Sequence, residues 1–219
     1  MFHKTLLVVA MLGAGAAQAD PLDLRRADRI DGDAAAGAAK VTVCVACHGP
    51  EGNALVPAFP ALAGQNAEYL YRTLAGFKRR ADPASPMTAQ VEKLDDADLR
   101  NIAAYFAARK RSAAPAAAGD RTTGAAVFDR GDPARGIAPC RGCHGAAADG
   151  HPRAADGPAR YAYYPVLAGQ NADYLVARLA QYRDGKIDDT TNALIMRGVA
   201  HNLDDASIRA LADWLAAQR

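Results

Sequence analysis

The sequence predicts an all-α protein built from two tandem copies of one helical domain. The pentapeptide Cys44-Val45-Ala46-Cys47-His48 returns as Cys140-Arg141-Gly142-Cys143-His144. An eleven-residue run that begins at Pro60 returns at Pro165 with nine identical residues, at a constant offset of 105. Each copy then closes with apolar residues at the i, i+3, i+4, i+7 spacing of an amphipathic helix. Chance does not plausibly produce this agreement, so the chain is interpreted as a duplication.

Residues 1–19 have the features of a cleavable signal peptide. Lys4 gives the start a positive charge, an apolar run follows, and Ala17-Gln18-Ala19 offers small residues at the two positions that a signal peptidase reads. The apolar run is too short to span a bilayer comfortably, although an uncleaved membrane anchor is the alternative. We therefore expect export to the periplasm, with cleavage after Ala19.

The remaining chain divides into two domains and a linker. Residues 20–111 form the expected first domain, which opens with a charged, extended lead-in over residues 20–31. Residues 112–124 are the expected linker, because residues 112–119 consist of small residues and proline. The second domain follows over residues 125–219. Short helices are expected ahead of each pentapeptide, at residues 32–37 and at residues 131–136.

The repeated pentapeptide predicts covalent haem. Two cysteines three residues apart, followed at once by histidine, form the attachment signature of c-type haem. Thiols at this spacing lie on one face of a helical turn, where each adds to one haem vinyl group, and the histidine becomes the proximal iron ligand. A four-thiolate zinc site and a thioredoxin-like pair are alternatives that leave the histidines unexplained. Two covalently bound haem c groups are expected, with these ligands: Cys44, Cys47 and His48 for haem 1, and Cys140, Cys143 and His144 for haem 2.

The composition agrees with haem and excludes nucleic acid as a partner. Alanine supplies much of the 50% apolar content, so a small domain would bury a thin core without a large cofactor. Removal of the signal peptide leaves 25 basic and 24 acidic residues without a basic stripe. The cluster Arg109-Lys110-Arg111 is typical of a helix end, where cations offset the helix dipole.

Two further helices repeat in each copy. Asn66 and Asn171 are expected N-caps of helices whose tyrosines, Tyr69 and Tyr174, either pack in the core or contact haem. Leu94-Asp95-Asp96 and Leu203-Asp204-Asp205 open the closing helices, with the first aspartate of each pair as the cap. Between the second pentapeptide and Pro165 the offset rises from 96 to 105. The nine extra residues predict a longer surface loop within residues 146–164.

The sixth iron ligand is predicted to be methionine in both copies. Met87 and Met196 are the only methionines after the signal peptide, and each precedes its Leu-Asp-Asp by seven residues. A methionine alone is more often a core residue, but equivalent placement of the only two favours ligation. His151 and His201 have no counterpart in the other copy, so we expect them to be solvated or locally bonded. Six-coordinate irons would leave no position for oxygen or peroxide.

These features together resemble the cytochrome c4 family over nearly the whole mature chain. The resemblance rests on the tandem CxxCH units, the repeated Pro-x-Leu-Ala-Gly-Gln run, the methionine spacing and the signal sequence. It implies two class I cytochrome c domains related by a pseudo-two-fold axis, with haems that face each other. It also implies that the carbonyls of Pro60 and Pro165 accept the Nδ1 protons of His48 and His144. The lead-in and Arg79-Arg80 depart from the family pattern.

The family's role implies an electron-transfer protein rather than an enzyme. Such a protein carries single electrons from a cytochrome bc complex or a dehydrogenase to a terminal oxidase or reductase, often loosely attached to the membrane. A similar architecture occurs in the dihaem subunit of flavocytochrome c sulfide dehydrogenases, which would make the chain a subunit of a catalytic complex. A dihaem peroxidase is the third alternative and would need a haem that can open its sixth position.

Overall fold

A computed structural model describes residues 20–112 and 121–218 of the chain. The expected signal peptide and residues 113–120 of the expected linker lie outside the described residues. Over the two described ranges the protein is all-α, as predicted, and its only β pairing consists of two isolated bridges, Leu22 with Thr190 and Asp132 with Ile137. Of the helices in those ranges, none is both long and apolar enough to cross a bilayer.

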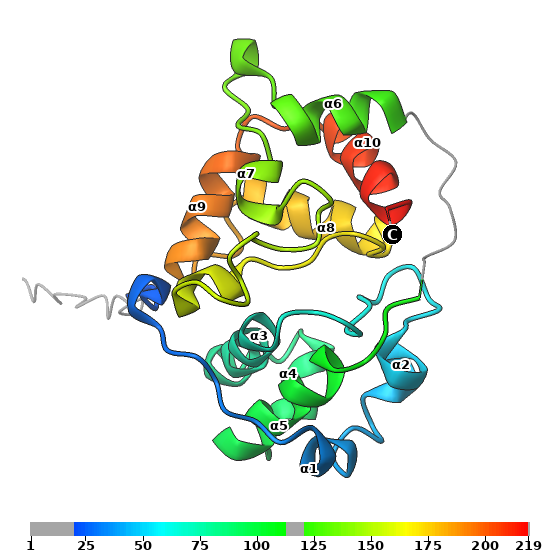
Figure 1. Cartoon of the computed structure of the whole chain (residues 1–219), viewed down its shortest axis with the longest axis vertical. Helices are drawn as coiled ribbons and strands as arrows, with labels where there is room; N and C mark the ends of the chain where they lie inside the picture. The colour runs from blue at the N-terminus through cyan, green and yellow to red at the C-terminus, as the bar shows by residue number, and fades with distance from the viewer. Residues whose placement is uncertain (1–19, 113–120, 219) are drawn as a thin grey trace, which may run out of the picture.

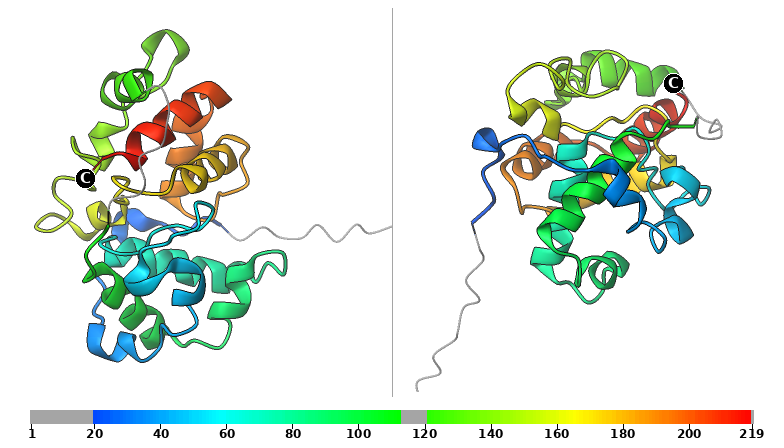
Figure 2. Two further views of the ribbon diagram at one scale, coloured as in Figure 1. Left: turned by 90° about the vertical axis from the view of Figure 1, so that its right-hand side faces the viewer. Right: turned by 60° about the horizontal axis from the view of Figure 1, so that its bottom comes forward.

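The helices fall into two groups that stack along the long axis of the molecule (Figures 1 and 2). The first domain contains α1 (Ala34–Ala38), α2 (Val45–His48), α3 (Ala67–Arg80), α4 (Pro86–Val91) and α5 (Asp96–Ala107), with the short 3₁₀ turns η1 (Leu24–Arg26) and η2 (Pro50–Gly52). The second contains α6 (Arg121–Arg130), η3 (Pro133–Arg135), α7 (Arg141–His144), η4 (Ala159–Tyr163), α8 (Ala172–Arg183), α9 (Thr191–Ala200) and α10 (Asp205–Ala216).

Both domains are organised around a close crossing of their first and last helices. α1 packs on α5 and α6 packs on α10. A Cβ at Gly37 would lie 2.1 Å from the Asn101 carbonyl oxygen, and one at Gly124 would lie 2.1 Å from that of Ala210. Only glycine permits such an approach of two backbones. Each closing helix begins as predicted, because Asp95 and Asp204 accept hydrogen bonds from the N–H groups three residues on.

The first helix of the second domain is not where the repeat predicted it. Residues 131–136 form only the 3₁₀ turn η3, and the counterpart of α1 is α6, which starts at Arg121 inside the range expected for the linker. The glycine that lies against the closing helix is Gly124, which contacts Ala210 and Trp214 as Gly37 contacts Asn101 and Tyr105. The second copy therefore carries an insertion before its pentapeptide as well as after it.

The second insertion is not a simple surface loop. Tyr163 is 2% exposed, and its hydroxyl donates a hydrogen bond to the carbonyl of Asp28 in the lead-in at 2.7 Å. The loop also contacts α3 of the first domain through η4. The end of the insertion therefore packs against the other domain, whereas residues such as Arg153 and Asp156 are exposed, as predicted for a surface loop.

The repeated Gly-Gln-Asn sequence builds a two-fold interface between the domains. Gln65 accepts from the N–H of Val166 at 2.8 Å and donates to its carbonyl at 2.9 Å. Gln170 does the same with Ala61, at 2.7 and 2.9 Å. Ala61 and Val166 are themselves equivalent at the offset of 105. The two glutamines are each 4% exposed, so these bonds form in a nearly dry interface.

The asparagines extend the same interface. Asn66 and Asn171 precede α3 and α8 at the N-cap position, as expected, but their side chains make no capping bond. They cross the interface instead, where Asn66 donates to the Tyr164 carbonyl and Asn171 to the Phe59 carbonyl, each at 2.7 Å. A capping residue was predicted from local sequence, whereas the bond actually made is between domains.

Arg111 is a single residue that serves both halves. Its Nε donates to the carbonyl of Ala63 at 2.8 Å and its Nη1 to the carbonyl of Ala168 at 2.9 Å. These two carbonyls are equivalent in the repeat, so the guanidinium lies close to the pseudo-two-fold axis. Burial lowers the pKa of Arg111 to about 10. Sequence analysis had assigned this residue to a helix end.

Candidate haem sites

Each pentapeptide folds into one helical turn that gathers its cysteines and histidine. α2 and α7 span four residues each, and Cys44 and Cys140 occupy the position before them. The N–H of His48 donates to the Cys44 carbonyl at 2.9 Å, and that of His144 to the Cys140 carbonyl at 3.1 Å. No cysteine forms a disulfide in the described chain, where all four occur. This is the geometry that thioether attachment to one macrocycle requires.

The two histidines are buried and oriented in the same way. His48 is 7% exposed and its Nδ1 lies 2.9 Å from the Pro60 carbonyl oxygen, while His144 is 5% exposed and its Nδ1 lies 3.0 Å from that of Pro165. Since a carbonyl only accepts, Nδ1 carries the proton and Nε2 presents its lone pair. Burial lowers the pKa of both rings, which favours the neutral form that binds a metal.

The Nε2 atom of His144 provides a test of whether this site suits haem iron. It is buried and has no hydrogen-bond partner among the described residues. Buried polar atoms are normally paired, so an orphaned nitrogen requires an explanation. A proximal iron ligand needs such a nitrogen, held at Nδ1 and free at Nε2. The residues present therefore fit a covalently bound haem.

The proximal sides of the two sites are similar but not identical. Phe59 lies edge-on to His48 at a ring-centroid distance of 6.1 Å, and Tyr164 takes the equivalent place beside His144 at 6.3 Å. His151 is found only in the second domain, where its ring stacks on Tyr161 at 4.0 Å and its Nδ1 accepts from the Arg153 N–H. His151 is thus locally bonded, as expected.

The two methionines lie on equivalent helices in different registers. Met87 is the second residue of α4, which packs on α3, and Met196 is the sixth residue of α9, which packs on α8. Pro86 starts α4 late, whereas the Thr190 side chain caps α9 by accepting from the Ala193 N–H at 3.0 Å. Both methionines are half-buried, and Met87 packs against the same core cluster as Cys44.

Two half-buried arginines between the domains, each with a buried Nε atom, were missed by sequence analysis. Tyr69 and Tyr174 interact with each other across the interface and belong to neither core cluster, contrary to the core placement that sequence favoured. Arg178 lies beside both, and its Nε, like that of Arg72, is buried without a partner among the described residues. Neither arginine could have been singled out, because burial of a charge depends on a neighbouring domain that the local pattern does not contain.

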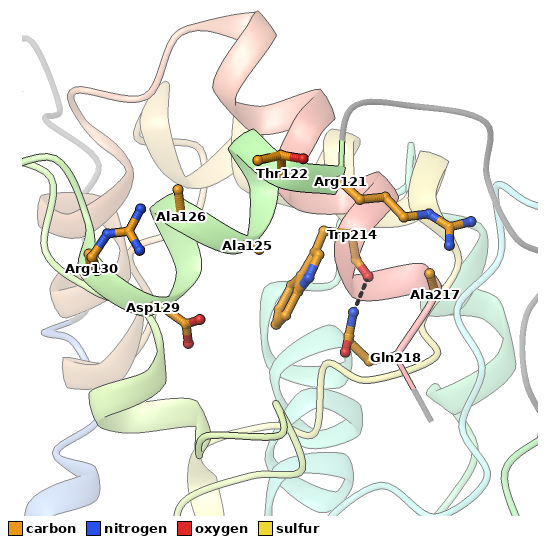
Figure 3. Close-up of a pocket in the computed structure, with 9 residues that line it drawn as sticks. All are labelled: Arg121, Thr122, Ala125, Ala126, Asp129, Arg130, Trp214, Ala217 and Gln218. Carbon is orange, nitrogen blue, oxygen red and sulfur yellow. Dashed lines mark hydrogen bonds between the residues drawn. The ribbon is translucent and has the colours of Figure 1, made fainter.

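A surface groove between α6 and α10 is distinct from both haem sites. It is open, has a volume of 490 Å³ and is lined in the described chain by residues such as Arg121, Asp129 and Trp214 (Figure 3). The Trp214 indole packs on the Phe128 ring at a centroid distance of 4.6 Å. The backbone carbonyl of Trp214 accepts a hydrogen bond from the Gln218 side-chain amide at 2.8 Å. No cysteine, histidine or methionine of the predicted sites lines it.

Comparison with known proteins agrees with this geometry. The family model described as cytochrome c matches twice, at residues 34–110 and 122–218, so the chain consists of two cytochrome c domains. Cytochrome c4 of Azotobacter vinelandii is 35% identical over 193 residues, covering 84% of this chain and 88% of the relative. The crystal structure of reduced recombinant cytochrome c4 from Pseudomonas stutzeri has a TM-score of 0.76 at 36% identity, covering 86% of this chain and 100% of that one. The chain belongs to the cytochrome c4 family.

A relative with a different name also matches. A protein named thiosulfate dehydrogenase electron acceptor, from Thiomonas intermedia, is 34% identical over 191 residues and covers 84% of this chain and 82% of its own length. Family membership and the cysteine pairs give two covalently bound haem c groups in this protein. The protein is a dihaem electron carrier, as its sequence predicted.

Proposed function

We propose that the protein is a periplasmic relay that passes single electrons through two six-coordinate haems to a terminal oxidase or reductase. His48 with Met87 would ligate the first iron, and His144 with Met196 the second. The observation that carries the proposal is the pairing, in each half, of a buried histidine fixed through Nδ1 with a methionine on the helix packed against α3 or α8. Methionine opposite histidine raises the reduction potential.

The protein's own groups would supply positioning and electrostatics. Each cysteine S–H would add across one vinyl group, which fixes the ring to its helical turn. The Pro60 and Pro165 carbonyls would hold the proximal rings in one tautomer. We assign the unpaired Nε–H groups of Arg72 and Arg178 to the haem propionates, because a buried donor without a partner calls for an acceptor such as a carboxylate. Bound haem supplies reversible one-electron chemistry at iron.

The test of ligation is the near-infrared methionine-to-iron band of the holoprotein. We expect Met87→Ala and Met196→Ala each to remove about half of its intensity and to lower one potential by on the order of 0.2 V, a fraction of the ~0.8 V range that axial ligands span. Ile195→Ala, a truncation of the exposed residue beside Met196, is the matched control and should retain the full band. Retention of the full band in both methionine variants would refute the assignment.

Carbon monoxide separates the carrier from a peroxidase. The wild-type ferrous protein should not bind it, whereas Met196→Ala should bind one equivalent, because the substitution opens a single iron. Binding by the wild-type protein would favour the peroxidase.

Two donors compete for the proposed relay. The family suggests a cytochrome bc complex or a dehydrogenase, and the Thiomonas relative favours a thiosulfate dehydrogenase among the latter. Stopped-flow mixing of the ferric protein with each enzyme and its substrate measures haem reduction directly. A flavoprotein that co-purifies with the chain would instead support the sulfide dehydrogenase subunit. Recovery of mature protein that begins at Asp20 would support export to the periplasm.

A further inference from the structure

The lead-in, residues 20–31, is bonded to the second domain although it belongs to the chain of the first. Leu22 donates from its N–H to the Asp189 carbonyl and accepts from the Thr191 N–H, each at 3.0 Å. The N–H of Leu24 donates to the Thr191 hydroxyl at 3.0 Å, and the Leu24 side chain is 4% exposed. These contacts tie the lead-in to the start of α9, the helix that carries Met196.

The second half of the lead-in returns to the first domain and bridges both on the way. Arg29 forms an ion pair with Glu68 of α3 at 3.3 Å. The same guanidinium donates to the carbonyls of Ala155 and Gly157, in the insertion of the second domain, at 3.2 and 2.9 Å. Since Glu68 is 8% exposed, this crossing is partly shielded from water.

Asp189 joins the same edge of the two domains directly. Arg79 at the end of α3 donates to its carbonyl at 3.1 Å and lies 3.3 Å from its carboxylate, which also pairs with Arg80. The Asp189 side chain is 18% exposed. One residue of the second domain thus binds two arginines of the first domain and the backbone of the lead-in.

This edge lies opposite the side on which α6 begins. In Figure 1 η1 sits beside α9 on the left, whereas the described chain leaves the first domain at Ser112 and resumes at Arg121 on the right. The match to the cytochrome c model begins at residue 34, so the lead-in lies outside the matched domain. Without the lead-in, the Asp189 ion pairs and the insertion loop would join the two domains at this edge.

We propose that residues 20–31 form a clasp that holds the two haem domains in one fixed relation. Arg29 and the bonds of Leu22 and Leu24 fasten it, and Asp189 anchors it. A second consequence rests on the proposed relay: the clasp keeps the distance between the haems constant and so sets the rate of electron exchange between them. Arg79 and Arg80, which depart from the family pattern, are explained by this edge rather than by an external partner.

Calorimetry of the holoprotein tests whether the clasp holds the two domains together. A mature chain that begins at Gly32 behind the same signal sequence should unfold in two transitions where the full chain unfolds in one. In Arg29→Gln and Asp189→Asn the single wild-type transition should broaden or begin to separate into two. Arg25→Gln, whose partner is Asp23 within the clasp, and Asp188→Asn, an exposed neighbour of Asp189, are the matched controls and should not. A single unchanged transition in the truncated chain and in both test variants would overturn the clasp.

Electron exchange tests the second consequence separately. After rapid partial reduction, re-equilibration between the two haems should slow several-fold in the truncated chain and in Asp189→Asn, but not in Asp188→Asn. Two unfolding transitions with an unchanged exchange rate would overturn the claim that the clasp sets the rate. Absence of exchange in the wild-type protein would overturn the relay, whatever the calorimetry gives.

Discussion

The two domains are alike in their pentapeptide turns and in the central interface between them, and they differ in the segments that flank these parts, including the lead-in and the insertion that cross between the domains. The pentapeptide turn, the histidine-to-proline carbonyl bond and the Gly-Gln-Asn interface recur with nearly the same distances. The segment before the pentapeptide, the loop after it and the lead-in do not recur. The two-fold contacts therefore recur in both domains, whereas the non-repeated segments lie at the edges of the molecule. Arg111 is the exception, because this single residue bonds to both halves and lies near the pseudo-two-fold axis.

The largest expected effect comes from breaking the two-fold glutamine contacts. Gln65→Leu would leave the Val166 N–H and carbonyl and the Asn66 N–H without partners, and Gln170→Leu would do the same on the other side. Each unsatisfied buried group costs about 1–3 kcal/mol, so either variant should lose roughly 3 kcal/mol or more of unfolding free energy. Chemical denaturation of the holoprotein measures the loss.

The two glutamine variants should also lose equal amounts of unfolding free energy, which is a more stringent test. If the interface is two-fold symmetric in energy as well as in geometry, the two variants should agree within about 0.5 kcal/mol, the usual margin of additivity. Gln90→Leu, at an exposed position on α4, is the control and should have little effect. If only one glutamine variant loses unfolding free energy, the two glutamines contribute unequally to stability although their hydrogen-bond distances are nearly equal.

The next effect concerns the helix crossings that begin each domain. Gly37→Ala and Gly124→Ala would each place a Cβ 2.1 Å from a backbone oxygen, and overpacking of this kind costs about 1–3 kcal/mol. Gly198→Ala, with nothing within 4 Å, is the control and should be neutral or stabilising. Differential scanning calorimetry would report the shifts. A neutral Gly124→Ala would contradict the equivalence of α6 and α1.

These residues also indicate how far sequence alone could reach. Constant offsets predicted the helices, the pentapeptide turns and the closing caps, because they depend on local chemistry that repeats. The first helix of the second copy was misplaced, since residues 131–136 resemble residues 32–37 in composition while Gly124 makes the required contact. The roles of Gln65, Asn66 and Arg111 were missed because each has a partner in the other domain, and no local pattern specifies a partner more than forty residues away.

The smallest expected effect is a pH-dependent stabilisation of the first domain by the Asp96 carboxylate. Tyr71 and Arg100 donate to the Asp96 carboxylate and hold its pKa below the ordinary 3.8, and the second copy has Val176 in place of the tyrosine. A lowered carboxyl pKa stabilises the folded state above the ordinary value, and this stabilisation is lost as pH falls through the folded value. Asp96→Asn should therefore lose under about 1 kcal/mol at pH 7, as surface pairs do, and the difference from wild type should shrink as pH falls below the ordinary carboxyl pKa of 3.8.

The matched substitution in the second domain makes this prediction specific. Asp205 occupies the place of Asp96 and pairs with Arg183 at 2.6 Å, but its side chain is 90% exposed. Asp205→Asn should therefore change the denaturation midpoint less than Asp96→Asn at pH 7. If the two variants change the midpoint equally, Tyr71 contributes nothing to the stabilisation that the Asp96 carboxylate provides.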